Sequence, residues 1–206
     1  GGRVWIASCG VDDWDSSVDA SGGYASSTGP ALCEDGAAGT VFGLSCAGKS
    51  NLVRVDNRGR VLSADSLIVG ARRGDGRSMS AEPRLPVFSL SVDHGASLVP
   101  DDEACNVSAA DEIIVSDNSK LTTNGAAWLT SRGLYVQSSS LVTSRRVSSG
   151  GILHDTVQLD VTELVEVDEL SSIQPLSVAH VGGMVDISGL VQGPPAARAS
   201  LFVPAR

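Results

Sequence analysis

The chain has 206 residues, a formal net charge of −9 and an aromatic content of 4%. This length suits one domain, since domains usually have about 100 to 200 residues. The negative charge argues against nucleic acids and anionic membranes as partners, because both require a surface rich in Lys and Arg. No apolar run approaches the roughly 20 residues of a membrane span, so we expect no direct membrane insertion by this segment.

Residues 1–50 predict a loop-rich N-terminal segment, because they are rich in Gly and Ser and hold three of the four cysteines. No two cysteines have the Cys-x-x-Cys spacing of zinc sites. We therefore predict disulfides formed in an oxidising compartment, with four buried free thiols in a reducing compartment as the alternative. The connectivity stays open. The disulfide candidates are Cys9, Cys33, Cys46 and Cys105.

Residues 43–50 match the G-x-x-x-x-G-K-[ST] pattern of the nucleotide-binding P-loop. A working P-loop needs a helix that begins at its Lys-Ser pair, because that helix N-terminus helps to hold the phosphates. The residues after Ser50 alternate as a strand does, and the sequence from Asn57 to Gly59 favours a turn. We therefore predict a strand after Ser50, no nucleotide binding and no other cofactor.

Residues 71–86 contain two glycines and two prolines and predict a long surface excursion. Within this excursion Arg73, Gly74 and Asp75 form a tripeptide that is a candidate for recognition by an integrin-type receptor. Asn106 begins an Asn-Val-Ser sequon and is a candidate for N-glycosylation, in agreement with a secreted or surface location.

Residues 51–191 carry β-type apolar clusters that recur at a regular interval. Four equally spaced valines mark them (136 − 115 = 157 − 136 = 178 − 157 = 21): Val115, Val136, Val157 and Val178. A second short group of apolar residues follows most of these valines a few positions later: Leu121, Leu141-Val142, Leu164-Val165 and Met184-Val185. Such a period predicts a stack of units that bury one another. We expect Val136 and Val157 to stack directly on each other in the core.

The predicted fold class is all-β, a single-stranded parallel β-helix (β-solenoid) with rungs of about 21 residues. Gly, Asn and Asp between the clusters predict tight corners, and three short strands with their corners fill one such rung. A β-sandwich is the alternative, because it also has short strands with turns at intervals of about 8–12 residues. Residues 192–206 form a terminal Pro/Ala-rich segment, in which Leu201 to Val203 predict a last short strand or the beginning of a removed continuation.

The sequence predicts no catalytic or metal site. An acidic run from Asp12 to Asp19 lacks the spacing of a calcium loop, and we interpret it as solvated. The three histidines lie beside predicted corners. A carboxylate next to a histidine in the sequence would point to the opposite face of a strand, so we expect no catalytic pair there. A β-helix enzyme needs carboxylates on one face of successive rungs. Four candidates have unequal offsets from the repeated valines and do not align: Asp117, Asp155, Asp160 and Asp186.

The Trp-Ile-Ala-Ser-Cys start at residues 5–9, the Gly/Ser-rich acidic run after it and rungs such as Leu134 to Val142 resemble the dispersed-gene-family surface proteins of trypanosomes. The resemblance covers nearly all of the chain. It implies a piece of a very large surface or secreted protein with β-helix repeats and an adhesive role. It transfers no functional residue.

Together these features predict a non-enzymatic extracellular or cell-surface β-solenoid with a structural or adhesive role, as a fragment of a larger surface protein. The expected partner is a host receptor, a glycan or a neighbouring surface protein. The alternative is a carbohydrate-active β-helix enzyme of the polysaccharide lyase or glycosidase type. Glycan binding without turnover would support the non-enzymatic protein, and binding with turnover would support the enzyme.

Overall fold

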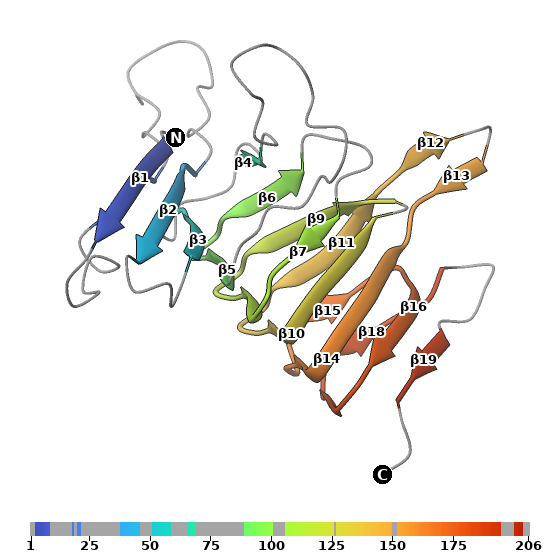
Figure 1. The fold of residues 1–206 in the computed structure, drawn as a ribbon. Helices are drawn as coiled ribbons and strands as arrows, with labels where there is room; N and C mark the ends of the chain where they lie inside the picture. Colours follow the sequence, from blue (N-terminus) through green and yellow to red (C-terminus); the bar gives the residue numbers. More distant parts are fainter. Residues whose placement is uncertain are drawn as a thin grey trace.

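The computed structural model describes residues 3–8, 18, 20–21, 38–45, 51–58, 66–68, 89–100, 106–125, 127–149, 152–194 and 200–203. These residues form strands, turns and connecting segments, and no helix occurs among them (Figure 1). The predicted all-β class is therefore confirmed. No helix long and apolar enough to cross a membrane is found in the described part of the chain.

Most strands belong to two sheets. The large sheet contains β1 (Arg3–Ser8), β2 (Thr40–Ser45), β3 (Asn51–Asp56), β5 (Ser89–Asp93), β7 (Val107–Ser108), β8 (Glu112–Val115), β10 (Trp128–Val136), β14 (Val157–Val167), β16 (Leu176–Val181), β17 (Met184–Ile187) and β19 (Ser200–Phe202). The small sheet contains β4 (Ser66–Ile68), β6 (Ser97–Pro100), β9 (Lys120–Asn124), β11 (Leu141–Arg145), β15 (Ser172–Ile173) and β18 (Leu190–Val191). A separate hairpin joins β12 (Val147–Ser149) to β13 (Ile152–His154).

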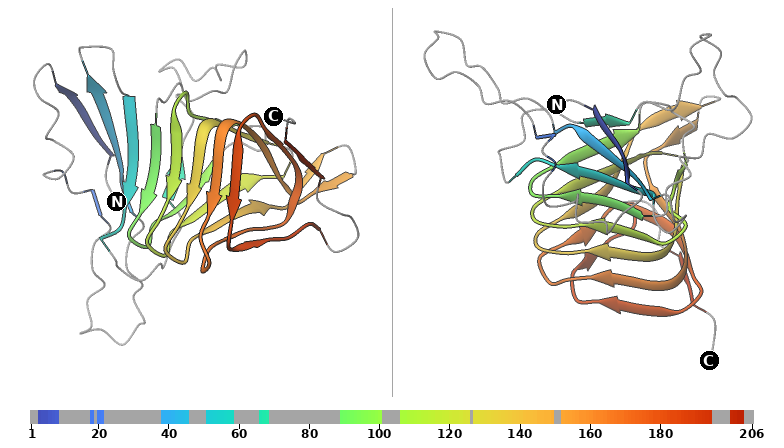
Figure 2. Two further views of the ribbon diagram at one scale, coloured as in Figure 1. Left: turned by 90° about the horizontal axis from the view of Figure 1, so that it is seen from below. Right: turned by 60° about the vertical axis from the view of Figure 1, so that its left-hand side comes forward.

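From β5 onward the chain alternates between the sheets and returns each time to a strand beside the one it left (Figure 2). All the pairings from β3 to β19 within the two sheets are parallel. In the segment predicted to be loop-rich, β1 and β2 pair in parallel, whereas β2 and β3 pair antiparallel. In the Pro/Ala-rich segment β19 begins at Ser200, one residue before the predicted last strand.

The core between the sheets is built from columns of aliphatic side chains that lie in register on neighbouring strands. Two columns come from the large sheet and one from the small sheet: Val92, Val115, Val136, Val167 and Ile187; Leu90, Ile113, Leu134, Val165 and Val185; and Leu98, Leu121, Val142, Ile173 and Val191. All but the last member of each column are buried. This agrees with a core without large aromatics, because β-branched and leucine side chains pack well at strand spacing.

The register corrects the expected stacking. Val136 pairs with Val115 as predicted from the constant valine spacing, but its partner on the other side is Val167, whereas Val157 pairs with Leu176. Two changes account for this. The hairpin of β12 and β13 lengthens the connection between β11 and β14, and β14 is an eleven-residue strand that begins at Val157 and ends at Val167.

The second apolar groups of the repeat do not all lie in the same sheet, because Leu121 and Leu141-Val142 lie on β9 and β11 of the small sheet. Leu164 and Val165 lie on β14, the same strand as Val157, and they pair with Met184 and Val185 of β17 within the large sheet. The true small-sheet strands that follow are β15 and β18. The spacing of the valines therefore stays constant along the sequence, but beyond Val136 the valines no longer occupy equivalent positions in the sheet.

The corners after the large-sheet strands use left-handed backbone conformations. Asp117, Asn118, Ser138 and Ser139 have φ values of 55°, 59°, 54° and 65°. Asn and Asp tolerate this region well, which is why the sequence predicted corners there, whereas serine enters it less often. Immediately after these residues a serine turns inward and is buried at Ser119 and again at Ser140.

Candidate functional site

A groove of about 520 Å³ lies on the outer face of the large sheet, across β14, β16 and β19. Its central row is set by strand register, because Asp160 pairs with His180 and His180 pairs with Phe202. The three side chains are exposed and therefore point away from the core. The groove is lined by Asp160, Val161, Thr162, His180, Val181, Gly182, Leu201, Phe202 and Val203.

An aromatic cluster lies along the groove. The ring centroids of Trp128 and His180 are 5.7 Å apart at an interplanar angle of 47°. The rings of His180 and Phe202 are 5.2 Å apart and nearly perpendicular, at 83°. Trp128 is half-buried on β10, so its ring reaches across β14 to His180. Such tilted and edge-to-face contacts stabilise an aromatic row and leave parts of the ring faces accessible.

Two glycines shape the sheet beside the groove. A Cβ atom on Gly182 would lie 2.5 Å from the carbonyl oxygen of Thr162, and one on Gly183 would lie 1.9 Å from that of Glu163. Both distances are shorter than any non-bonded contact of a real Cβ atom, so only glycine allows β14 and the chain between β16 and β17 to approach this closely. Because Gly182 has no side chain, the sheet surface is hollow at this point.

The surface next to the groove is acidic. Arg132 forms ion pairs with Asp111 and, at 3.5 Å, with Glu163. Burial raises the pKa of the Tyr135 hydroxyl above its ordinary value; Glu112 and Glu166 raise it further, whereas Arg132 lowers it. The negative potential of these carboxylates therefore outweighs the positive potential of the single guanidinium at this tyrosine.

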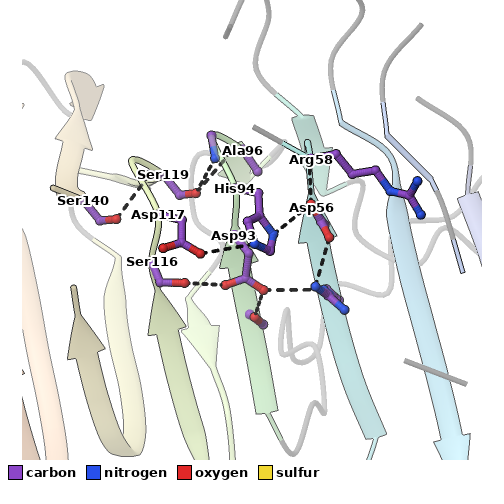
Figure 3. A network of polar contacts seen from close by, with 12 residues as sticks. Asp56, Arg58, Asp93, His94, Ala96, Ser116, Asp117, Ser119 and Ser140 are labelled. Carbon is purple, nitrogen blue, oxygen red and sulfur yellow. Dashed lines mark hydrogen bonds and ion pairs between the residues drawn. The ribbon is translucent and has the colours of Figure 1, made fainter. Parts of the chain in front are cut away.

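A second cluster, which we call the Asp–His corner, lies where β3, β5 and β8 end (Figure 3). The imidazole of His94 lies between two carboxylates, with Nδ1 3.2 Å from Asp56 and Nε2 3.3 Å from Asp117. Asp93 accepts a hydrogen bond from the hydroxyl of Ser116 at 2.8 Å and lies 3.5 Å from Nε of Arg54. Asp56 and Asp93 are direct register partners on neighbouring strands.

The contacts of the Asp–His corner indicate a structural brace between three strands. Asp56 accepts the backbone N–H of Arg58 at 2.7 Å and also lies 2.9 Å from Arg54. Asp93 is largely buried and also accepts the hydroxyl of Ser91. Carboxylates with so many protein partners have little capacity left to act on a substrate. No group of three or more His, Cys, Asp or Glu side chains in the described ranges is arranged to hold a metal ion.

The four carboxylates considered for a β-helix enzyme are not brought together. Asp117 contacts His94, Asp155 lies 3.3 Å from Arg146, and Asp160 lies in the groove. Asp186 pairs in register with Glu166. Two pairs of carboxylates are register partners, Glu166 with Asp186 and Asp56 with Asp93. The second pair was missed by sequence reasoning although Val-Asp precedes a turn in both places.

The structure bears on only some of the other candidates. The predicted strand after the P-loop pattern is confirmed, because β3 begins at Asn51 and Leu44 of β2 pairs with it. The Oδ1 atom of Asn106 accepts the backbone N–H of Trp128 at 2.8 Å, and the side chain is half-buried. Several candidates lie outside the described residues: Cys9, Cys33, Cys46 and Cys105, the Arg73-Gly74-Asp75 tripeptide and the acidic run from Asp12 to Asp19.

No protein-family model matches the chain, and neither the curated proteins nor the solved structures contain a match to it.

Proposed function

We propose that the chain is a non-enzymatic β-solenoid, a parallel β-helix of an extracellular or cell-surface protein, which binds a neutral saccharide in the groove on its outer face. Two observations support the solenoid. The chain alternates between two sheets with parallel pairings from β3 onward, and the core columns continue from strand to strand. The β-sandwich alternative is less favoured, because its sheets are antiparallel.

The row of Asp160, His180 and Phe202 beside Trp128 carries the saccharide proposal. Sugars present an apolar C–H face that stacks on aromatic rings and a rim of hydroxyl groups that bind carboxylates and imidazoles. A site with apolar rings and a few polar groups supplies both kinds of contact. The nearby acidic residues, including Glu163 and Glu166, would repel uronic, sulfated or sialylated sugars, so the proposal specifies a neutral ligand.

The absence of a carboxylate pair in the groove supports binding without turnover. Most glycosidases use two carboxyl groups on either side of the scissile bond. Among the described residues that line the groove, Asp160 is the one carboxylate. The second candidate, a carbohydrate-active β-helix enzyme, would depend on the aligned Asp56 and Asp93; it is the weaker candidate, because both carboxylates have several protein partners and lie on β3 and β5 rather than in the groove.

The test is glycan binding followed by a search for products. The parent chain is screened against immobilised neutral and acidic glycans, and the best ligand is titrated by calorimetry. We expect His180→Ala and Phe202→Ala to weaken binding of a neutral glycan about fivefold each, as expected for loss of a stacking contact. Met184→Ala, an exposed apolar side chain outside the groove lining, is the matched control and should leave affinity unchanged.

Two results would reject saccharide binding in the groove: no glycan bound by the parent, or a glycan bound equally by the parent, His180→Ala and Phe202→Ala. New reducing ends or unsaturated products after incubation would instead support the enzyme. In that case Asp56→Asn and Asp93→Asn should remove the turnover.

A further inference from the structure

The groove on the outer face of the large sheet crosses the strands. Its lining residues come from three neighbouring strands and the residues that directly follow two of them: 160–162, 180–182 and 201–203. In the sheet β14, β16 and β19 lie side by side in this order, with β10 before β14 (Figure 1). Neighbouring strands are about 4.8 Å apart, so a ligand that fills the groove extends over several strands rather than along one.

Three rings follow the same direction. Trp128 projects from β10, His180 from β16 and Phe202 from β19. The ring centroids are 5.7 Å apart between Trp128 and His180 and 5.2 Å apart between His180 and Phe202. One sugar residue of a linear glycan has nearly this length. Rings at such intervals therefore match successive residues of a chain better than they match a single sugar.

The rings are also turned relative to one another. The planes of Trp128 and His180 meet at 47°, and those of His180 and Phe202 meet at 83°. A sugar stacks with its C–H face parallel to an aromatic ring, so a flat chain can stack on only one of the three rings. A chain whose successive residues are rotated can present a face to more than one ring. The angles therefore favour a coiling glycan, such as an α-1,4-linked glucan, over the flat ribbon of a β-1,4-linked glucan.

The polar side chains of the groove lie beside the central ring. Asp160 and Thr162 are both exposed and lie two residues apart on β14. Asp160 is also the register partner of His180. A carboxylate accepts hydrogen bonds from sugar hydroxyls, and a threonine hydroxyl both donates and accepts them. These two side chains therefore supply partners for the hydroxyl rim of a sugar that stacks at His180.

We propose that the groove binds an internal stretch of a coiling neutral glycan of the α-1,4-linked glucan type, which lies across β10, β14, β16 and β19. Successive sugar residues contact Trp128, His180 and Phe202. The inference rests on the proposed saccharide site and specifies the ligand and its direction. It also includes Trp128, which does not line the groove itself, in the binding surface.

The test compares two series of glucose oligomers, from two to six units, by calorimetry on the whole chain. We expect maltotetraose to bind at least about tenfold more tightly than maltose, because it reaches all three rings. Maltohexaose should bind within about threefold of maltotetraose, since the added units find no further ring in the row. Cellotetraose, the flat chain of the same length, should bind at least about fivefold more weakly than maltotetraose.

Trp128→Ala should lower the ratio of the maltotetraose and maltose affinities from at least about ten to about two, because one ring of the row is lost. Trp128→Leu, which keeps an apolar side chain without a ring, provides a second variant should the first fail to fold. Tyr135→Ala is the matched control, because it removes a half-buried aromatic residue from the same strand outside the row. It should leave the ratio unchanged within about twofold.

The outcomes separate this inference from the saccharide site on which it rests. Equal affinity for maltose and maltotetraose, tighter binding of cellotetraose, or an unchanged ratio in the folded Trp128 variants would overturn the inference. The same holds if another neutral glycan binds in the groove and neither maltose nor maltotetraose does. No binding of any neutral glycan by the parent would reject the saccharide site together with the inference.

Discussion

The hydroxyl oxygen of Ser140 accepts a hydrogen bond from the backbone N–H of Ser119 at 3.2 Å, and both residues are buried (Figure 3). The contact is repeated on either side. The hydroxyl of Ser119 lies 3.1 Å from the backbone nitrogen of Gly95, and that of Ser171 accepts the N–H of Ser140 at 3.0 Å. A row of serines thus satisfies backbone donors that the turning chain buries at successive corners.

Ser140→Ala should lower the free energy of unfolding by about 1 to 3 kcal/mol, because it leaves the N–H of Ser119 buried without its acceptor. Urea denaturation measures the effect. Ser188→Ala, at an exposed serine in the corner after β17, should change stability by less than about 0.5 kcal/mol. Equal losses in the two variants would show that burial of the serine row is not what matters.

Val136→Asp should prevent cooperative folding, because the carboxylate would be buried without a partner between Val115 and Val167. Gln137→Asp should fold and lose only a little stability, since it removes the 2.6 Å hydrogen bond from the side chain of Gln137 to Glu166 at the half-buried outer face. Circular dichroism melting curves compare them. If both variants melt as the parent does, the assigned core face is incorrect.

Gly183→Ala should destabilise the protein by at least about 1 to 3 kcal/mol, because the new Cβ would overlap the backbone carbonyl of Glu163. Gly133→Ala is the informative comparison. Its Cβ would lie 2.9 Å from Cε2 of Tyr135, and an aromatic ring can rotate away where a backbone carbonyl cannot. Thermal unfolding should therefore separate the two variants, with Gly133→Ala closer to the parent.

Asp168→Asn should make stability less dependent on pH in the acidic range. Burial raises the pKa of Asp168, but hydrogen bonds from the Ser171 side chain and from the backbone of Ser138 and Leu170 outweigh it, so the pKa lies below the ordinary 3.8. A lowered pKa means that the carboxylate stabilises the fold above pH 3.8 and that this contribution is lost as pH falls through the folded value.

At neutral pH the Asp168→Asn variant should be less stable than the parent by about 1 kcal/mol, since hydrogen bonds to a charged acceptor are stronger than those to an amide. Urea titrations at a series of pH values between neutral and strongly acidic test this. A gap between parent and variant that stays constant down to the lowest pH would contradict the assignment.

Non-reducing mass spectrometry tests the extracellular assignment. If the protein is extracellular, native material should lack two or four hydrogens relative to the reduced chain. At least one disulfide should then join two of Cys9, Cys33 and Cys46, where a crosslink contributes about 2 to 4 kcal/mol. Four titratable thiols in freshly purified, unreduced protein would place the chain in a reducing compartment and remove the main support for a surface role.

Strand positions followed from the sequence because alternation with period two survives wherever one face of a strand is buried. β3 appears where the alternation after Ser50 predicted a strand, and β8 lies at the apolar cluster marked by Val115. Register was less predictable. Val157 and Val178 kept the regular spacing of the earlier valines. Val115 and Val136 end their strands, however, whereas Val157 begins β14 and Val178 is the third residue of β16, because the hairpin before Val157 and the eleven-residue β14 shifted the chain.

The groove could not be derived from sequence for the same reason. Asp160 and His180 were each considered, but their adjacency depends on an offset between strands (180 − 160 = 20) that no local pattern reveals. Asp56 and Asp93 are further apart in the sequence (93 − 56 = 37), because the long excursion lies between their strands. Alignment of the Val55-Asp56-Asn57 and Val92-Asp93-His94 segments would have found this pair.

The hairpin of β12 and β13 adds residues to the chain without changing which residues of the large sheet are register partners. Successive members of the column that runs from Val55 to Ile187 lie at unequal intervals in the sequence (92 − 55 = 37, 115 − 92 = 23, 136 − 115 = 21, 167 − 136 = 31 and 187 − 167 = 20), yet each remains paired with the next. Residues inserted between β12 and β13 should therefore leave the buried columns unchanged, because the hairpin forms a sheet of its own. The tip is therefore a position at which evolution can diversify the surface, or an engineer can graft a foreign loop, while the scaffold keeps its alignment.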